Sequence, residues 1–107
     1  MTRSIGPKRI AFARIAAAAL DRAPEIVARW LPDGRREGSE WVARNPMRAD
    51  HRPGSFKVNL RTGRWGDFST GDKGGDLIAL AAFLFTGGDM GEAARRVAEM
   101  VGIDPHV

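Results

Sequence analysis

Residues 56–85, FKVNLRTGRWGDFSTGDKGGDLIALAAFLF, contain the hairpin and the helix that decide the fold class. In FKVNL, residues 56–60, apolar and polar side chains alternate with the period of two that a half-buried strand requires. Thr62-Gly63 predicts a turn, and RWGDF, residues 64–68, is the expected return strand of a hairpin. The side of the first strand that faces the core is predicted to carry Phe56, Val58 and Leu60.

The second half of this stretch predicts a buried helix. LIALAAFLF, residues 77–85, is apolar on nearly all sides, which is typical of a central core helix. Asp76 precedes it and can cap its first turn, since a carboxylate accepts hydrogen bonds from the free amides there. Gly87 and Gly88 are expected to end the helix.

The glycines between these two elements raise the question of a phosphate-binding loop. Gly66 and Gly71 have the spacing of a P-loop, in which a lysine and a hydroxyl then bind the terminal phosphate and magnesium. Asp72 occupies the lysine position and repels phosphate, and Lys73 is followed by glycine instead of a hydroxyl residue. The chain also lacks the strand–helix units of a Rossmann fold and a motif for nucleophilic catalysis. We therefore expect a binding or accessory domain, not an enzyme.

Helices are also expected before the sheet. Residues 1–23 predict an alanine-rich helix that begins at Pro7, and residues 24–107 form the predicted domain. PEIVARWL, residues 24–31, predicts a second helix, since its proline interrupts the first one and is tolerated in a first turn. DGRREGS, residues 33–39, predicts a turn-rich loop.

The remaining segments complete an α+β arrangement. EWVAR, residues 40–44, predicts a strand, and residues 45–54, with two prolines, predict a loop. After the core helix, Asp89 and Glu92 match the capping-box pattern at the start of a last helix, which Gly102 closes. The fold class expected is α+β, with a small antiparallel sheet of three to four strands between N-terminal and C-terminal helices.

Charge is distributed unevenly along the 107 residues. Residues 1–73 contain fifteen Lys and Arg against eight Asp and Glu, whereas residues 74–107 contain two against five. The basic first part indicates a surface for a polyanion, although an arginine-rich and alanine-rich composition is also typical of a GC-rich genome. Because the chain has no cysteine, and His51 and His106 lie far apart, we expect no disulfide, metal or other cofactor. No signal-peptide pattern or run of transmembrane length is present, so we expect a cytoplasmic protein without membrane contact.

The order of these pieces from Pro24 to Asp104 resembles the N-terminal zinc-ribbon domain of bacterial replicative DNA primases and of related primase-helicases of phages and plasmids. That family has a short helix, a basic loop, a Cys-Pro-x-His motif, a Pro-Ser-Phe strand and a hairpin with a Cys-x-x-Cys-Gly turn. Gly-Gly-Asp and an apolar helix follow. The resemblance implies that the small sheet is zinc-ribbon-like. The pieces that match best are Asn45-Pro46, Pro53 with Ser55-Phe56, Trp65 to Phe68, and Gly74-Gly75-Asp76.

The chain departs from this family at the zinc site. The four ligand positions of the family fall near Asn45, Arg48, Asp67 and Thr70 or Gly71, and none of these is cysteine or histidine. We therefore expect a zinc-free relative, in which other contacts replace the metal as a folding clamp. The candidate replacements are hydrogen bonds of Asn45 and Asp67, an Arg48–Asp67 ion pair, and apolar packing by Trp41, Trp65 and Phe68.

The family's function implies template recognition. In the family this domain binds single-stranded DNA beside a polymerising domain, so the expected partners are single-stranded DNA and a primase or helicase protein of a phage or mobile element. Cations follow the phosphates and exposed aromatic rings stack on bases. We expect Phe56 and Phe68 in the core and leave Trp65 open between the core and stacking. The predicted nucleic-acid-binding residues are Arg44, Arg48, Arg52, Lys57, Arg61, Arg64, Trp65 and Lys73.

A protein-interaction module is the alternative. If the domain has lost DNA binding together with its zinc ligands, the acidic, alanine-rich C-terminal helices would dock a partner or a second copy of the chain. Size-exclusion chromatography with and without DNA distinguishes the two, because a stable dimer that is indifferent to DNA favours the alternative.

Overall fold

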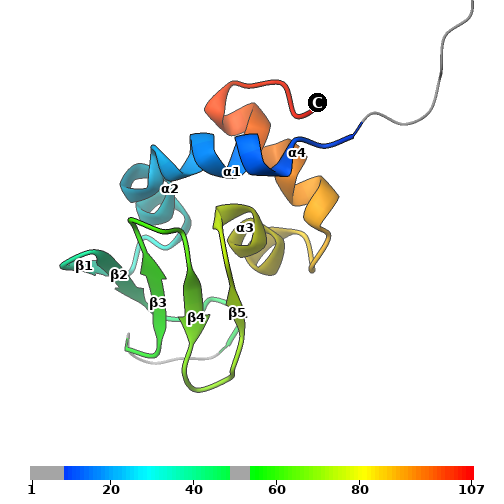
Figure 1. Ribbon diagram of the computed structural model, residues 1–107. Coiled ribbons are helices and arrows are strands. Elements are labelled where there is room, and N and C mark those ends of the chain that lie inside the picture. The colour runs from blue at the N-terminus through cyan, green and yellow to red at the C-terminus, as the bar shows by residue number, and fades with distance from the viewer. Residues whose placement is uncertain (1–8, 49–53) are drawn as a thin grey trace, which may run out of the picture.

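The computed structural model describes residues 9–48 and 54–107 and confirms the α+β class (Figure 1). Within these residues, two helices precede a five-stranded antiparallel sheet and two helices follow it. In chain order the elements are α1 (Phe12–Leu20), α2 (Ala23–Trp30), β1 (Arg35–Glu37), β2 (Glu40–Ala43), β3 (Phe56–Asn59), β4 (Trp65–Asp67), β5 (Lys73–Gly74), α3 (Leu77–Phe85) and α4 (Met90–Val101).

The sheet is a meander in which each strand pairs with the next one along the chain. The predicted hairpin of β3 and β4 is confirmed, because Val58 pairs with Trp65 across the two strands. Gly63 closes the turn by donating its amide to the carbonyl of Asn59 at 2.8 Å. Its φ of +81° lies in the left-handed region, which glycine adopts readily.

The described sheet has more than the expected three to four strands because two strands form where the sequence predicts none: β5 in the glycine-rich segment after the hairpin, and β1 in the expected loop. Arg35–Glu37 pairs with β2, and Gly38, with a φ of +63°, turns the chain back into that strand. All side chains of β1 are exposed, so no alternation of apolar and polar residues marks it. Pairing with β2 alone therefore makes this segment a strand.

One face of the sheet packs against the helices. Phe56 and Val58 are completely buried, as the alternation in β3 predicts. The centroid of the Phe56 ring lies 6.0 Å from that of Trp65 and 6.1 Å from that of Phe83, so an aromatic cluster joins the sheet to α3. The helices add to this core Ile15, Ala19, Ile26, Val27, Leu77, Ile78, Leu80 and Val97.

Both C-terminal helices begin with the predicted caps. The carboxylate of Asp76 accepts a hydrogen bond of 2.8 Å from a backbone amide of α3, and that of Asp89 accepts one of 3.0 Å from the amide of Glu92. The Glu92 carboxylate contacts Arg95 and Arg96 instead of returning to the cap, so half of the predicted capping box forms. None of the described helices is by itself long and apolar enough to cross a membrane; α3 and α4 pass that test only as a pair bent by 111°.

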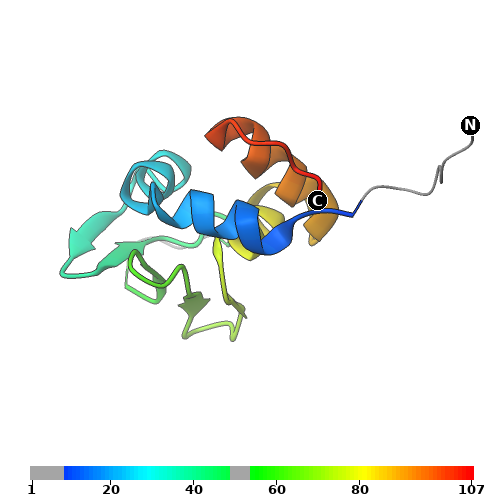
Figure 2. The same cartoon turned by 45° about the horizontal axis from the view of Figure 1, so that its top comes forward.

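The two ends of the described chain lie side by side (Figure 2). Ile10 forms an isolated antiparallel bridge with His106, and the guanidinium of Arg14 donates hydrogen bonds to the carbonyl oxygens of Asp104 and His106. The C-terminal segment is therefore attached to the start of α1.

The first helix begins later than the sequence predicts. Residues 9–11 are occupied by pairing with the C-terminal segment, so the helix expected from Pro7 starts at Phe12, and residues 1–8 lie outside the described part. Ile15 and Ala19 of this helix are completely buried. α1 therefore contributes to the core that the sheet and the other helices share.

Candidate functional site

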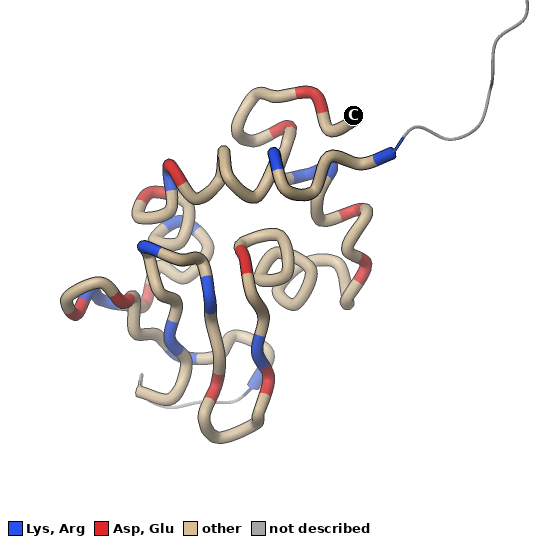
Figure 3. Tube along the Cα trace, in the orientation of Figure 1, with Lys and Arg blue, Asp and Glu red and all other residues tan. Residues whose placement is uncertain are grey.

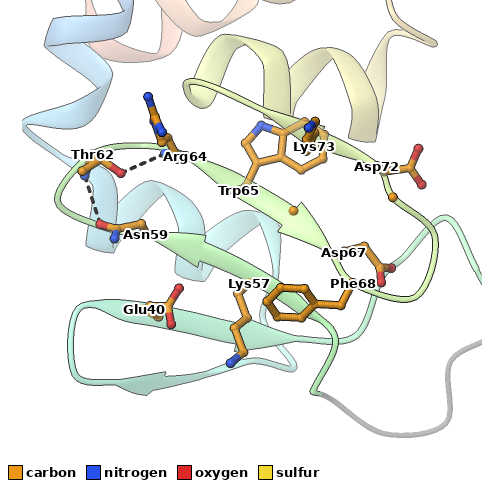
Figure 4. Close-up of a pocket in the computed structure, with 12 residues that line it drawn as sticks. Glu40, Lys57, Asn59, Thr62, Arg64, Trp65, Asp67, Phe68, Asp72 and Lys73 are labelled. Atoms are coloured by element: carbon orange, nitrogen blue, oxygen red, sulfur yellow. Dashed lines mark hydrogen bonds between the residues drawn. The ribbon is translucent and has the colours of Figure 1, made fainter.

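An open groove of about 790 Å³ lies on the face of the sheet that points away from the core (Figure 4). Side chains alternate along a strand, so burial of Phe56 and Val58 directs Lys57 and Asn59 to the opposite face. The groove is open because β4 places a glycine, Gly66, on this face.

Gly66 forms the floor between two lysines. It pairs with Lys57 on one side and with Lys73 on the other, so the three residues make a row across β3, β4 and β5. Neighbouring strands lie about 4.8 Å apart, and the two lysines therefore start about 10 Å from each other. A Cβ built on Gly66 would meet no atom closer than 3.5 Å, so the fold tolerates a side chain there. Glycine at this position leaves the groove empty between the cations.

Phe68 is an exposed aromatic residue of the groove, whereas Trp65 is buried. The Phe68 side chain is 82% exposed, and its ring centroid lies 5.5 Å from Nζ of Lys57, within range of a cation–π contact. Trp65 is 7% exposed and its ring packs in the aromatic cluster of the core, so it offers no free face for stacking. The expectation of Phe68 in the core is wrong because Asp67 takes the inward position at the end of β4.

Cations and carboxylates share this groove. Figure 3 shows both kinds of charge close together along β3, β4 and β5. Among the described residues no ion pair joins the groove's cations to its carboxylates. Asp67 is buried and both of its oxygens accept hydrogen bonds from the protein, so the carboxylates that remain available to a ligand are those of Glu40 and Asp72. The cations are Lys57, Arg64 and Lys73, and the carboxylates are Glu40, Asp67 and Asp72.

The positions that the resemblance assigns to zinc ligands contain a buried hydrogen-bonded pair. Asn45 donates from Nδ2 to Oδ2 of Asp67 at 2.8 Å, and this bond joins the segment after β2 to the end of β4. Oδ1 of Asp67 accepts hydrogen bonds from the amide and from the hydroxyl of Ser69, at 2.8 and 2.7 Å. In place of the expected Arg48–Asp67 ion pair, the guanidinium of Arg48 donates to the Ser69 hydroxyl. Hydrogen bonds thus connect the segment after β2 to the loop after β4.

These hydrogen bonds also keep Asp67 ionised. Burial by itself raises the pKa of Asp67, but hydrogen bonds from the Ser69 hydroxyl, from Asn45 and from the Ser69 amide outweigh it and hold the pKa well below its ordinary value. The site does not suit zinc, because it offers an amide and a guanidinium where zinc takes thiolates or imidazoles, and the carboxylate is already bonded. Within residues 9–48 and 54–107, no three His, Cys, Asp or Glu side chains form a group that could hold a metal ion.

The structure separates the predicted nucleic-acid-binding residues. Arg44 and Arg48 line a different hollow, of about 300 Å³, beside the end of α2. Arg61 is exposed in the turn between β3 and β4, and Arg52 lies outside the described residues. The four that line the groove are Lys57, Arg64, Trp65 and Lys73.

Glu40, Asn59 and Asp72 also line the groove, and none of them is among the residues that the sequence predicts for the site. Glu40 and Asn59 face each other because of the register between β2 and β3, which no local pattern reveals. The signal available for Asn59 was its polar position in the alternating segment of β3.

No family model matches this chain, and no curated protein matches it either.

Proposed function

We propose that this chain is a nucleic-acid-binding module that holds single-stranded DNA in the groove on the outer face of the sheet. The observation that carries the proposal is the exposed ring of Phe68 beside Lys57, in a groove that also presents Arg64 and Lys73. An exposed aromatic ring stacks on an unpaired base of any kind, and the cations around it neutralise phosphates. In a duplex the faces of each base are stacked on the neighbouring base pairs and cannot stack on Phe68, so this groove favours a single strand.

Within this proposal the domain is a zinc-free relative of the primase zinc ribbon. The Asn45–Asp67 hydrogen bond supports this, since it connects the two loops that the metal connects in the family that the sequence resembles. The module would recognise the template for a primase-like replication system of a phage or mobile element. It would act in the cytoplasm beside a primase or helicase domain that performs the catalysis.

A salt titration of DNA binding tests the proposal. Fluorescence anisotropy with a labelled thymidine oligonucleotide of about 20 nucleotides gives the Kd between about 50 and 200 mM salt. For single strands the logarithm of the binding constant falls with a slope of about 0.7 per neutralised phosphate, so three groove cations predict a slope of about −2. A duplex of the same length is expected to bind more weakly at each salt concentration.

Charge-reversal variants then locate the binding surface. Lys57→Glu and Lys73→Glu are expected to weaken binding and to reduce the slope by about 0.7 each. Arg29→Glu is the matched control, because Arg29 is exposed on α2 and does not line the groove. Equal losses in all three variants would mean that net charge determines binding, and absence of binding at low salt would refute the proposal.

A protein-interaction module is the second candidate, and an apolar patch on the helices favours it. Phe85 is 49% exposed, and its ring meets that of Trp30 edge-on at 5.5 Å. Both border a hollow of about 170 Å³ between α2, α3 and α4. A dimer or complex that is indifferent to DNA in size-exclusion chromatography, and that Phe85→Glu disrupts, would support this candidate over the first.

A further inference from the structure

We propose that the groove reads a guanine base through Glu40 and Asn59, an inference that rests on the proposed binding of single-stranded DNA. Glu40 of β2 and Asn59 of β3 lie directly opposite each other in the register of the two strands, and both line the groove. Cβ atoms of directly opposed residues in antiparallel strands are about 5 Å apart. The two polar groups therefore stand side by side on the groove wall (Figure 4).

The side-chain amide of Asn59 is held in one orientation. Its Oδ1 accepts hydrogen bonds from the backbone amides of Arg61 at 2.9 Å and Thr62 at 3.1 Å, where the β3–β4 turn begins. Because the turn uses the oxygen, Nδ2 is the group left to a ligand; the hydrogen bonds of this side chain to the described residues are the two at Oδ1. Asn59 therefore offers the groove one fixed donor.

Glu40 offers two acceptors beside that donor. Its side chain is half-buried at the groove, and in the described part of the chain it forms no ion pair. The ammonium of the neighbouring Lys57 lies over the ring of Phe68. A carboxylate repels phosphates, so in a DNA groove it must face the part of a nucleotide that carries hydrogen-bond donors, which is the edge of the base.

Guanine is the base whose edge matches this pair. Its Watson–Crick edge carries the acceptor O6 and then two adjacent donors, N1–H and N2–H, and in a single strand this edge is free to be read. The two donors fit the two oxygens of Glu40 as a charge-assisted bidentate pair, and O6 fits Nδ2 of Asn59. Thymine has one N–H between two carbonyls, and adenine and cytosine have an amino group beside a bare ring nitrogen. None of these three supplies two adjacent donors.

Oligonucleotides that differ in one base test this assignment. The full chain is titrated with thymidine oligonucleotides of about twelve nucleotides whose central base is guanine, hypoxanthine or thymine. Hypoxanthine keeps O6 and N1–H but lacks the amino group at N2, so it loses one of the two hydrogen bonds to Glu40. We expect the guanine oligonucleotide to bind about tenfold more tightly than the hypoxanthine one, as for the loss of one hydrogen bond to a charged group.

Two variants separate the contact from general electrostatics. Glu40→Gln has one acceptor oxygen in place of two, so the preference for guanine over hypoxanthine should fall to about twofold or less. Glu37→Gln is the matched control, because this substitution removes the same charge from the position opposite Glu40 in the register of β1 and β2. Glu37 is exposed on β1 and does not line the groove. This variant should keep the tenfold preference.

The outcomes distinguish this inference from the function on which it rests. If wild type binds the guanine and hypoxanthine oligonucleotides equally, or if Glu37→Gln loses the preference as Glu40→Gln does, the guanine assignment is wrong while DNA binding stands. If none of the oligonucleotides binds at low salt, the proposed function is refuted and the guanine assignment with it.

Discussion

Asp67→Asn tests the buried hydrogen bonds that join the two loops at the edge of the sheet. In wild type, Asp67 accepts hydrogen bonds from Nδ2 of Asn45 and from the amide and hydroxyl of Ser69, at 2.7 to 2.8 Å. The variant replaces one acceptor oxygen by an NH₂ group, so a donor faces a donor at a side chain that is 3% exposed. A hydrogen bond to a charged group contributes about 1.5–3 kcal/mol, and the unpaired amide adds a desolvation cost. We therefore expect the free energy of unfolding to fall by about 2–4 kcal/mol at pH 7.

The pH dependence of this loss follows from the pKa of Asp67. Hydrogen bonding depresses that pKa in the folded state, so the stabilisation is complete above the pKa of the unfolded chain, about 3.9, and disappears as the pH falls through the lower folded pKa. At pH 3 the unfolded chain is mostly protonated at this residue, which removes about 1 kcal/mol of the difference between wild type and variant. The difference should therefore narrow as the pH falls from about 5 to 3.

Urea unfolding followed by the fluorescence of the three tryptophans measures both effects. Asp72→Asn is the control, because its side chain lies in the same loop and is not an acceptor of the buried hydrogen bonds; we expect it to change stability by about 0.5 kcal/mol or less. Two results would show that Asp67 is not the acceptor that connects the loops. One is that Asp67→Asn lowers the free energy of unfolding at pH 7 by no more than Asp72→Asn does. The other is that the difference in this free energy between wild type and Asp67→Asn grows as the pH falls.

Three further substitutions test the packing and the groove. Gly74→Ala should lower stability by about 1–3 kcal/mol in thermal or urea unfolding, because the new Cβ would lie 2.5 Å from Nε1 of Trp65. Gly66→Val should leave the circular dichroism spectrum and Tm nearly unchanged, since its Cβ has room, while it fills the groove floor and abolishes oligonucleotide binding in anisotropy. Phe68→Ala should also keep its stability, because the ring is exposed, and should weaken binding by about 1–3 kcal/mol; an unchanged Kd would exclude Phe68 as the stacking residue.

The parts of the fold that could be predicted from the sequence are those with a local signal. The alternation in β3 predicts the burial of Phe56 and Val58 because strand geometry relates residues two apart. Asp76 and Asp89 mark the starts of α3 and α4 because a cap acts on amides within the next turn. β1 could not be found this way, because its exposed side chains follow no pattern and only its pairing with β2 makes it a strand.

The candidate site shows the same division. Charge selects Lys57, Arg64 and Lys73, which line one groove, but it equally selects Arg44, Arg48 and Arg61, which do not. The burial of Trp65 and the exposure of Phe68 could not be predicted in this way, because a polar residue, Asp67, takes the inward position between them.

The sequence by itself determined the α+β class, the hairpin and the caps, whereas the sheet register decided which of the predicted cations line the groove. Only the tertiary structure decided what faces inward at the end of β4. A buried carboxylate is stable only where donors meet it, and the donor for Asp67 is Asn45, 22 residues away along the chain. The pairing of Glu40 with Asn59 likewise depends on the register of two strands. Contacts between distant segments therefore placed an aromatic ring and an acceptor–donor pair in one groove.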